Sequence, residues 1–329
     1  MLQTLEMGMK RVAGCLLGAC LTASLAASLA VPRPAAAEPI KVVVPFAAGG
    51  PVDQLARVLA NGLGPKLGED VIVDDRGGAG GAIAGEFVAR SKPDGKTVLL
   101  ASLGAFVIGP ILKPPANYDP IKSFEPVMLV GSVPSLIVVD PKSGITTLAD
   151  LIAKAKQQQL SYGSAGPGTT MNIALEMLNK AAGVKITHVP YRGAAPAITD
   201  LLGGHIDTLN ADLPVLLPLV KAGKVRALAL FSPERTPLLP DLPTTKELGF
   251  PGLVMENWYG VLVPAGTRKE ERDRLERALF DVIATPNVKA RFEADGTHGA
   301  LDHEAFASML SKQFAQWAER IKTLGISAE

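Results

Sequence analysis

Residues 41–53 read KVVVPFAAGGPVD, and residues 160–170 read LSYGSAGPGTT. Each stretch runs from a short apolar strand through a glycine-rich turn into the start of a helix. A helix N-terminus has unpaired N–H groups and about half a positive charge, so it can hold an anion without a basic side chain. Glycine also lets a ligand come close to the backbone. We therefore interpret the two stretches as a pair of anion-binding turns.

The competing interpretation is that each turn is only a tight connection between a strand and a helix. Taken alone, either turn favours that simpler interpretation. The presence of one such turn in each half of the chain shifts the balance toward binding. In a parallel α/β sheet both turns would lie at the carboxyl ends of strands, where ligands bind. The pair thus predicts one anion held between two halves of the molecule.

The chain around these turns alternates between strand-like and helix-like segments. Strands are expected at residues 40–44, 71–73, 97–101, 160–163, 186–189, 207–210, 225–230 and 258–263, with two more strand-like runs in residues 125–139 separated by Pro134. Helices are expected at residues 51–67, 82–90, 148–158, 169–182, 194–202 and 213–222, and after residue 267. This alternation predicts an α/β fold with a mostly parallel sheet covered on both faces.

The length of 329 residues suggests about two domains. Because helices follow a late strand, we expect a first lobe that is interrupted by a second and then completed. We place the crossings near Pro134 and Gly252, where proline and glycine punctuate the pattern. The expected organisation is residues 38–134 for the first part of lobe 1, residues 135–252 for lobe 2, and residues 253–329 for the return of lobe 1.

The N-terminal segment has the pattern of a secretory signal. Two basic residues precede an uncharged run over residues 12–31, and an Ala-x-Ala site follows at residues 35–37. We expect residues 1–37 to be a signal peptide that is cleaved after Ala37, which leaves a soluble mature protein outside the cytosol. A transmembrane anchor is the alternative, because the run is long enough to span a bilayer. Its richness in Ala, Ser and Gly disfavours that alternative.

Both cysteines, Cys15 and Cys20, lie in this segment. A loose lipoprotein box ends at Cys20, but apolar residues continue after it, which disfavours a lipid tether. Cleavage after Ala37 leaves no disulfide, thiolate nucleophile or cysteine-based metal site. It also removes three of 33 basic and one of 32 acidic side chains, leaving 30 and 31. This balance, with aromatic residues at 5%, argues against nucleic acid as a partner.

Other motifs that carry chemistry are incomplete. The glycines of residues 77–81 lack dinucleotide-binding spacing, and no Lys-Ser or Lys-Thr pair follows them as in a P-loop. Residues 162–166 lack the glycine two positions before the serine that a nucleophile elbow needs. The histidines at positions 188, 205, 298 and 303 do not have metal-ligand spacing. We therefore expect no cofactor and no metal, and we disfavour the alternative of an exported hydrolase-like enzyme.

In their order along the chain, these and further motifs resemble the extracytoplasmic solute receptors of tripartite tricarboxylate transporters, also called Bug receptors or TctC proteins. The motifs that carry the resemblance lie at residues 45–53, 75–81, 92–95, 163–170, 190–197, 201–207, 258–260 and 264–267. Each is weak singly, and their order makes the resemblance specific over essentially the whole chain after residue 37. It implies the type II periplasmic binding protein fold, with two doubly wound α/β lobes around a central ligand cleft, and a receptor rather than an enzyme.

The resemblance also implies a ligand class, a location and a partner. Members of the family resemble one another in binding small carboxylates in the periplasm, with little use of arginine, and the partner is a membrane permease of the tripartite tricarboxylate type. A sensory role, in which the ligand is presented to a membrane kinase, stays open. The implied ligand-binding residues are Phe46, Ala48, Gly49, Gly50, Val52, Asp53, Ser102, Ser164, Ala165, Gly166, Gly168, Thr169, Asn172, Arg192, Gly193 and Asp212.

The implied mechanism is hinge closure of the two lobes around one carboxylate. Backbone N–H groups at the two helix starts would hold the carboxylate oxygens by charge-assisted hydrogen bonds. The hydroxyl groups of Ser102, Ser164 and Thr169 would add to them. Asp53 would repel an anion, so we expect it to orient its loop rather than to contact the ligand.

Two residues depart from the family pattern. Val52 stands where the family usually has Thr or Ser, and Asn172 stands where it often has His. An asparagine can donate and accept hydrogen bonds, but it cannot become charged. The first turn, which contains Phe46 and Val52, is rather apolar. It therefore favours an apolar or aromatic carboxylate over an amino acid as the ligand.

Overall fold

The computed structural model describes residues 38–115 and 117–326. The expected signal peptide of residues 1–37 lies outside the described residues. The nine strands of the described chain are β1 (Ile40–Val44), β2 (Val71–Asp75), β3 (Thr97–Ser102), β4 (Phe124–Val139), β5 (Leu160–Ser164), β6 (Ile186–Pro190), β7 (Thr208–Asp212), β8 (Arg226–Leu230) and β9 (Glu256–Pro264). Most of them match the expected strands to within two residues at either end.

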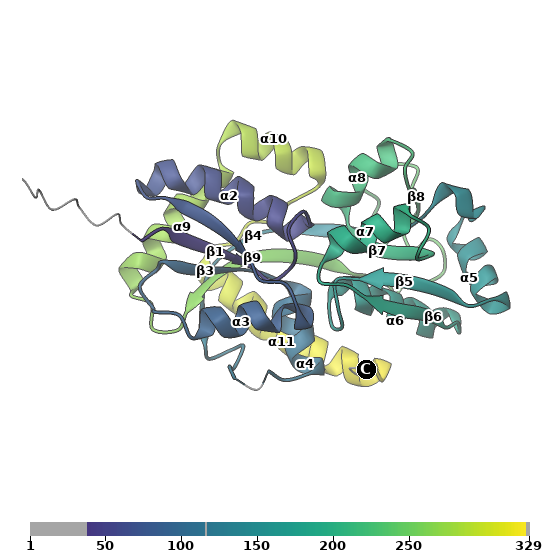
Figure 1. Ribbon diagram of the computed structural model, residues 1–329, viewed down its shortest axis with the longest axis horizontal. Helices are drawn as coiled ribbons and strands as arrows, with labels where there is room; N and C mark the ends of the chain where they lie inside the picture. The colour runs from purple at the N-terminus through teal and green to yellow at the C-terminus, as the bar shows by residue number, and fades with distance from the viewer. Residues whose placement is uncertain (1–37, 116, 327–329) are drawn as a thin grey trace, which may run out of the picture. The chain divides into compact units, whose positions relative to one another are not determined.

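Helices alternate with these strands as expected (Figure 1). The α-helices are α2 (Pro51–Leu67), α3 (Ala82–Ala89), α4 (Gly109–Leu112), α5 (Leu148–Gln157), α6 (Thr170–Ala182), α7 (Ala194–Leu202), α8 (Leu213–Lys221), α9 (Lys269–Ile283), α10 (Pro286–Asp295) and α11 (His303–Leu324). None of the described helices is both long and apolar enough to cross a bilayer.

The strands form two α/β lobes that share one strand. The order is β2-β1-β3-β9-β4-β7-β5-β6, and β8 pairs with β4 outside this path. The first part of β4 pairs with β9, and its last five residues pair with β7 and β8. In Figure 1, β4 and β9 run from the side of β1 and β3 toward that of β5 and β7. The two-lobed α/β fold is therefore the one that the sequence predicts.

The sheet is less parallel than predicted. Of the eight ladders between described strands, β1·β2, β1·β3, β5·β6 and β5·β7 are parallel, and the other four are antiparallel. All four antiparallel ladders involve β4 or β9. These two strands run back between the lobes and are not joined to their neighbours by strand–helix–strand crossovers, which is the connection that makes strands parallel.

Pro134 does not break the strand, contrary to the sequence-based expectation. β4 is continuous from Phe124 to Val139. Pro134 pairs with Glu256 on β9, and the next residue, Ser135, pairs with Asp212 on β7. A proline fits here because its missing N–H falls where the ladder changes partner. The lobe boundaries near Pro134 and Gly252 remain predictions.

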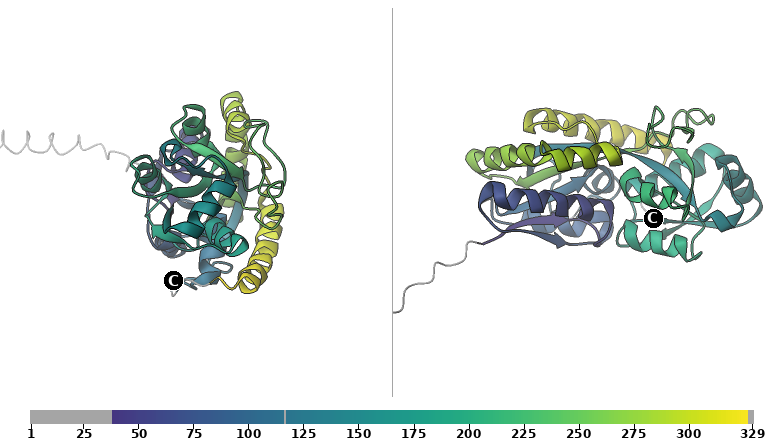
Figure 2. Two further views of the ribbon diagram at one scale, coloured as in Figure 1. Left: turned by 90° about the vertical axis from the view of Figure 1, so that its right-hand side faces the viewer. Right: turned by 90° about the horizontal axis from the view of Figure 1, so that it is seen from above.

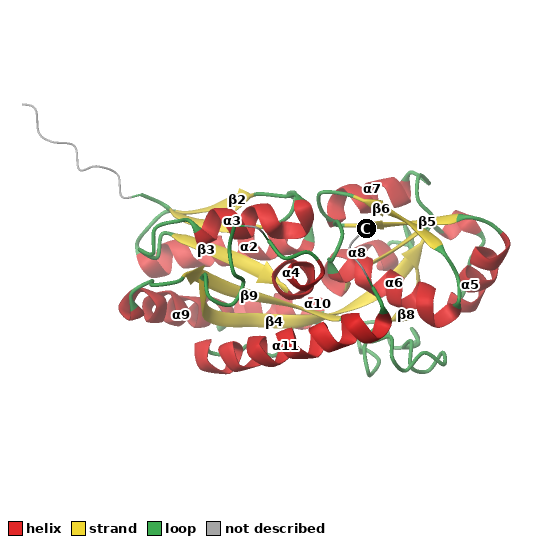
Figure 3. Ribbon diagram, turned by 90° about the horizontal axis from the view of Figure 1, so that it is seen from below, coloured by secondary structure: helices red, strands yellow, loops and turns green. Residues whose placement is uncertain are grey.

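Two apolar clusters cover the two faces of the sheet. One contains residues from α2, α7, α8 and α9, and the other contains residues from α3, α5, α6 and α11. Side chains along β4 point alternately to the two faces, so Val138 packs in the first cluster while Ile137 and Val139 pack in the second. The view from above shows α2 beside α9 (Figure 2), and the view from below shows α11 running along β4 (Figure 3).

A buried element next to the site was not predicted. After β3 the chain forms a π-helical turn over Gly104–Ile108 that continues into α4. Its residues are buried and almost entirely apolar, and a short apolar run of this kind has no periodicity that would separate a helix from a strand. The turn matters for the site, because it lies against the start of α6. A Cβ atom added at Gly104 would lie 2.6 Å from the backbone N of Thr170.

Candidate functional site

A small cavity lies where the ends of several strands and the starts of several helices meet. Its volume is about 30 Å³. The lining residues are Phe46, Gly50, Pro51, Val52, Ser102, Ala165, Thr169, Thr170, Met171, Ala194, Asp212 and Asn257. The strands that end at this cavity are β1, β3, β5 and β7. It therefore occupies the position where α/β sheets bind ligands, at the carboxyl ends of their strands.

The first glycine-rich turn presents the start of α2 to the cavity. Gly50 is the N-cap and Pro51 opens the helix, which suits a position that needs no N–H. Among the described residues, no acceptor bonds to the backbone N–H groups of Gly50, Val52 and Asp53. The start of α2 can therefore donate several hydrogen bonds to a ligand.

Asp53 supports this turn. Its Oδ2 accepts a hydrogen bond from the backbone N of Gly49 at 2.7 Å. Its Oδ1 lies 2.8 Å from Nε of Arg57, one helical turn further along α2. Both carboxylate oxygens are thus used by the chain itself, and Asp53 is not among the cavity residues. This is the geometry of a loop-orienting group, which is the role expected of it.

The second glycine-rich turn presents the start of α6. Thr169 is the N-cap, and its side chain donates to the carbonyl of Gly166 at 2.7 Å. The backbone N of Gly168 donates to Oδ1 of Asn172 at 2.9 Å, so this N–H is not available to a ligand. No acceptor in the described part of the chain bonds to the backbone N–H groups of Thr170 and Met171. The donors of this turn are therefore Thr170 and Met171 rather than the glycines.

A third helix start meets the cavity. α7 begins at Ala194 after the N-cap Gly193, and Ala194 lines the cavity. The sequence predicted this helix, and the resemblance implied that Arg192 and Gly193 before it contact the ligand, but a third helix N-terminus in the site was not predicted. Just before it, the carbonyl of Arg192 accepts a hydrogen bond from the backbone N of Ala47 at 2.9 Å. That bond joins the turn before α2 to the loop before α7.

The side chains of the cavity are mostly small or apolar. Phe46, Val52 and Met171 supply the largest apolar surfaces. The hydroxyl groups of Ser102 and Thr170 also line it, and neither bonds to another described residue. No Lys, Arg or His is among the described lining residues. Positive potential in the cavity thus comes from helix starts and not from basic side chains.

One acid, Asp212, reaches the cavity from the end of β7. Its Oδ2 accepts hydrogen bonds from Nδ2 of Asn257, at 2.8 Å, and from the hydroxyl of Tyr259. Its Oδ1 is buried and has no hydrogen-bond partner among the described residues. Burial raises the pKa of Asp212 to about 6, and the two hydrogen bonds limit that rise. Asp212 is therefore poised to gain or lose a proton near neutral pH.

Asn257 connects this acid to the first lobe. Its Oδ1 accepts hydrogen bonds from the backbone N of Leu103, at 3.2 Å, and of Trp258, at 3.0 Å. One asparagine on β9 thus bonds both to the residue after β3 and to the end of β7. Sequence analysis singled out the neighbouring Trp258 to Gly260 motif but missed Asn257, because nothing in its local sequence marks a buried, bridging amide.

The structure brings some predicted residues to the cavity and places others nearby. Seven predicted residues line it, namely Phe46, Gly50, Val52, Ser102, Ala165, Thr169 and Asp212. Pro51 and Thr170 also line it and lie within the two predicted glycine-rich turns, whereas three lining residues, Met171, Ala194 and Asn257, were missed. Gly49 and Gly193 flank it, and the exposed Ala48 lies outside it. Gly166 and Arg192 line a wider groove of about 790 Å³ between the loop of residues 77–80 and that of residues 190–192.

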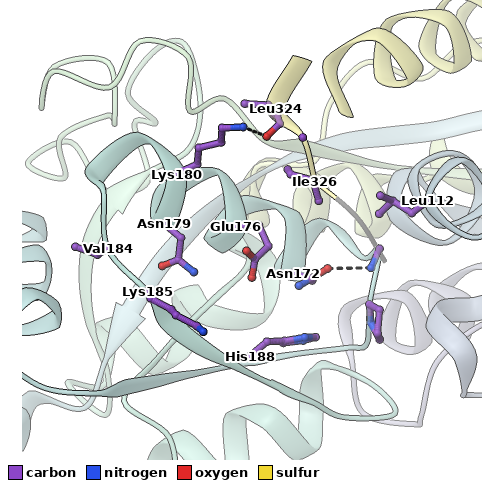
Figure 4. A pocket seen from close by; sticks show the side chains of 13 residues that line it. Leu112, Asn172, Glu176, Asn179, Lys180, Val184, Lys185, His188, Leu324 and Ile326 are labelled. Carbon is purple, nitrogen blue, oxygen red and sulfur yellow. Dashed lines mark hydrogen bonds between the residues drawn. The ribbon is translucent and has the colours of Figure 1, made fainter. Parts of the chain in front are cut away.

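Gly168 and Asn172 line a third hollow, of about 390 Å³, behind the second turn (Figure 4). In Figure 4 the Asn172 side chain points toward the backbone of that turn. Nδ2 of Asn172 donates to the hydroxyl of Tyr162 at 2.7 Å, and that hydroxyl donates to Glu176. Asn172 thus braces the turn from behind and does not reach the cavity.

Ser164 is placed differently from the expectation that its hydroxyl faces a ligand. The hydroxyl is buried, bonds to the backbone of Gly166, and lies 2.6 Å from Nε2 of His188. Sequence spacing did not suggest this serine–histidine pair, because the two residues come from adjacent strands. Ser164 has no exposed surface and is absent from the cavity lining, so a substrate cannot reach its oxygen in this arrangement.

Comparison with known proteins agrees with this architecture. The model of the tripartite tricarboxylate transporter family receptors matches residues 55–326. The chain belongs to this family. The receptor is 33% identical to Protein BugT of Bordetella pertussis over 88% of this chain and 90% of that protein.

Solved structures extend the likeness to the fold. An R. palustris protein solved with adipate has a TM-score of 0.83 and 32% identity, covering 88% of this receptor and 98% of that chain. MatC from Rhodopseudomonas palustris, solved with bound malate, has a TM-score of 0.80 and 29% identity, covering 85% and 98%. The two-lobed fold of this receptor is thus that of periplasmic solute-binding proteins.

Proposed function

We propose that this receptor captures a small carboxylate between its two lobes and delivers it to a membrane permease of the tripartite tricarboxylate type. The observation that carries the proposal is the convergence of three helix starts on one cavity, at Gly50, Thr169 and Gly193. Such N-termini bind anions through backbone N–H groups and the helix dipole. No basic side chain competes for this role among the described lining residues.

The carboxylate oxygens would accept hydrogen bonds from the N–H groups of Gly50 and Val52 on one side and of Thr170 and Met171 on the other. The hydroxyl groups of Ser102 and Thr170 would add to these. Hydrogen bonds to a charged group contribute about 1.5–3 kcal/mol each. A few of them would give an affinity near micromolar, which corresponds to about −8 kcal/mol.

Binding would require the lobes to separate and close again. The cavity of about 30 Å³ has roughly the volume of one water molecule. A carboxylate with several carbon atoms would therefore enter an opened form, and closure around it would bring the donors of both lobes onto it. The shared strand β4 and its partner β9 are the elements about which the lobes would move.

The cavity also supports a preference among carboxylates. Phe46, Val52 and Met171 line it, so the part of the ligand beyond the carboxylate would meet apolar surface. We propose an apolar or aromatic carboxylate rather than an amino acid. The structure solved with adipate, an acid with an aliphatic chain, comes from a related protein and fits this class.

Export completes the proposal. A signal peptide over residues 1–37, cleaved after Ala37, would place the receptor in the periplasm, where it would meet its ligand and its permease. Mass spectrometry of the protein purified from the periplasm tests this part. The expected N-terminus is Glu38, and a mature protein that keeps residues 1–37 or carries lipid on Cys20 would contradict it.

Thermal-shift screening of residues 38–329 tests the ligand class. A panel of mono- and dicarboxylates, including adipate, malate and benzoate, is compared with their neutral amides. A ligand at 100 times its Kd adds about 2.7 kcal/mol to stability. We expect carboxylates to raise the Tm and the amides to have no effect. A panel without any responding carboxylate would overturn the proposal. Tight aspartate binding without aromatic acid binding would overturn only the proposed preference for an apolar or aromatic carboxylate.

A further inference from the structure

Asp212 is the one acidic side chain among the described residues that line the cavity. It is 4% exposed. Its Oδ2 is occupied by Asn257 and Tyr259, whereas its Oδ1 is buried without a partner. An ionised carboxylate in this setting leaves one charged oxygen unsatisfied, which costs free energy. A proton on Oδ1 would turn that oxygen into a donor.

No described cation compensates the charge of Asp212. None of the ion pairs between described residues involves it. The titratable group that faces it from β9 is Tyr259, whose pKa is raised well above its ordinary value by burial and by Asp212 itself. Asp295, at the end of α10, acts on Tyr259 and adds negative charge. Asp53 on α2 is already paired with Arg57.

A second negative charge in this cavity would therefore be costly. A ligand carboxylate bound in this cavity and an ionised Asp212, which lines it, would lie close to each other. Two carboxylates that share such a site hold a proton between them, because like charges at short range raise the pKa of one member.

This inference rests on the proposed function. We propose that Asp212 binds the ligand in its protonated form, with Oδ1 donating a hydrogen bond to a carboxylate oxygen, so that capture of the anion takes up one proton from solvent. The near-neutral pKa of Asp212 in the absence of ligand makes that proton available at moderate cost.

Ligand affinity should fall as the pH rises. Asp212 is largely protonated below pH 6 and largely ionised above it. If only the protonated form binds the anion, the Kd rises with pH above about 6 and approaches a tenfold rise per pH unit. Simple carboxylic acids stay ionised over the same range, so the titration of the ligand does not produce this slope.

The experiment measures the Kd of adipate, and of benzoate as a second probe, between pH 6.5 and 8.5. The wild-type receptor is compared with Asp212→Asn, whose amide is a permanent donor of similar shape. We expect the Kd of the wild type to rise steeply with pH and that of Asp212→Asn to stay nearly constant. Asp295→Asn is the matched control, and it should keep the slope of the wild type.

Calorimetry in two buffers of different ionisation enthalpy gives a second readout that needs no variant. We expect close to one proton taken up per ligand at pH 8 in the wild type. A flat pH profile without proton uptake would overturn this inference while leaving carboxylate binding intact. An unchanged slope in a folded Asp212→Asn receptor would also overturn it. If neither probe nor any other carboxylate binds at any pH, the proposed function itself fails.

Discussion

The backbone N of Ala47 donates a hydrogen bond to the carbonyl oxygen of Arg192 at 2.9 Å. Ala47 belongs to the turn before α2 and Arg192 to the loop before α7, so a main-chain bond crosses from one lobe to the other. Close packing accompanies it, because a Cβ atom added at Gly80 would lie 2.5 Å from the carbonyl oxygen of Pro167. The two lobes thus touch through backbone atoms at this point, and substitutions where they meet are informative.

Gly50→Leu should strongly weaken ligand binding while the protein stays folded. A Cβ atom at this position has room, with its nearest neighbour at 3.7 Å, but the longer leucine side chain would fill the cavity and press on Ala194. We expect a loss of at least tenfold in carboxylate affinity, measured by calorimetry. Gly50→Ala is the matched control and should bind within a few-fold of the wild type. Normal binding by Gly50→Leu would remove this turn from the site.

Gly104→Ala should hinder closure of the lobes. The added Cβ atom would lie 2.6 Å from the backbone N of Thr170 and 2.8 Å from Cα of Thr169, and backbone atoms cannot move aside as a side chain can. We expect faster ligand release and a radius of gyration, from small-angle X-ray scattering, that does not decrease when ligand is added. Gly252→Ala, with no atom within 4 Å of its added Cβ, is the control. Compaction of both variants by ligand would contradict this account.

Asp212→Asn should stabilise the ligand-free receptor at neutral pH. Burial raises the pKa of Asp212 from 3.8 to about 6, so the folded state binds its proton more tightly than the unfolded state. The wild type therefore loses stability as the pH rises from about 4 to above 6, by on the order of 3 kcal/mol, and the variant lacks this loss. Urea unfolding of both proteins at pH 4.5, 6 and 8 measures the difference, which should grow with pH. A difference that stays constant would argue against the raised pKa.

Asn172→Leu should weaken ligand binding, although Asn172 does not line the cavity. The substitution removes the acceptor of the Gly168 N–H, and one lost hydrogen bond of this kind is worth about 1 kcal/mol, or about fivefold in affinity. Tyr162→Phe is the matched comparison, because it removes the next hydrogen bond of the network but leaves the bond between Asn172 and Gly168. We expect calorimetry to show a larger effect for Asn172→Leu. A larger effect for Tyr162→Phe would mean that the Tyr162 hydroxyl positions the turn, and not the hydrogen bond between Asn172 and Gly168.

Sequence reasoning predicted the parts of the fold and site that depend on local pattern. The turn at Gly50 and the helix start at Thr169 were found because proline, glycine and helical periodicity mark a strand–helix turn within a few residues. Ser102 and Asp212, which end strands, were predicted through the family resemblance. The two-lobed fold followed from the order of such motifs along the chain.

The features that were not predicted depend on contacts between segments far apart in the sequence, and no local sequence pattern indicates such contacts. Asn257 lies in the cavity only because β9 inserts between β3 and β4. The amide of Gly168 is unavailable because Asn172 turns back onto it. Pro134 was expected to break a strand because its sequence neighbours do not show that β4 changes partner there. Ser164 meets His188 through the pairing of two strands.

The position of β9 has a consequence for how the chain reaches its final form. β9 lies between β3 and β4 in the sheet, yet it is made from residues 256–264, long after both of its neighbours. The sheet therefore lacks the strand that joins β3 to β4 until most of the polypeptide has emerged from the ribosome. Insertion of β9 requires contacts between segments that are far apart in the sequence, and such contacts make folding slow. A truncated chain that ends before residue 256 should thus fail to mature and be degraded.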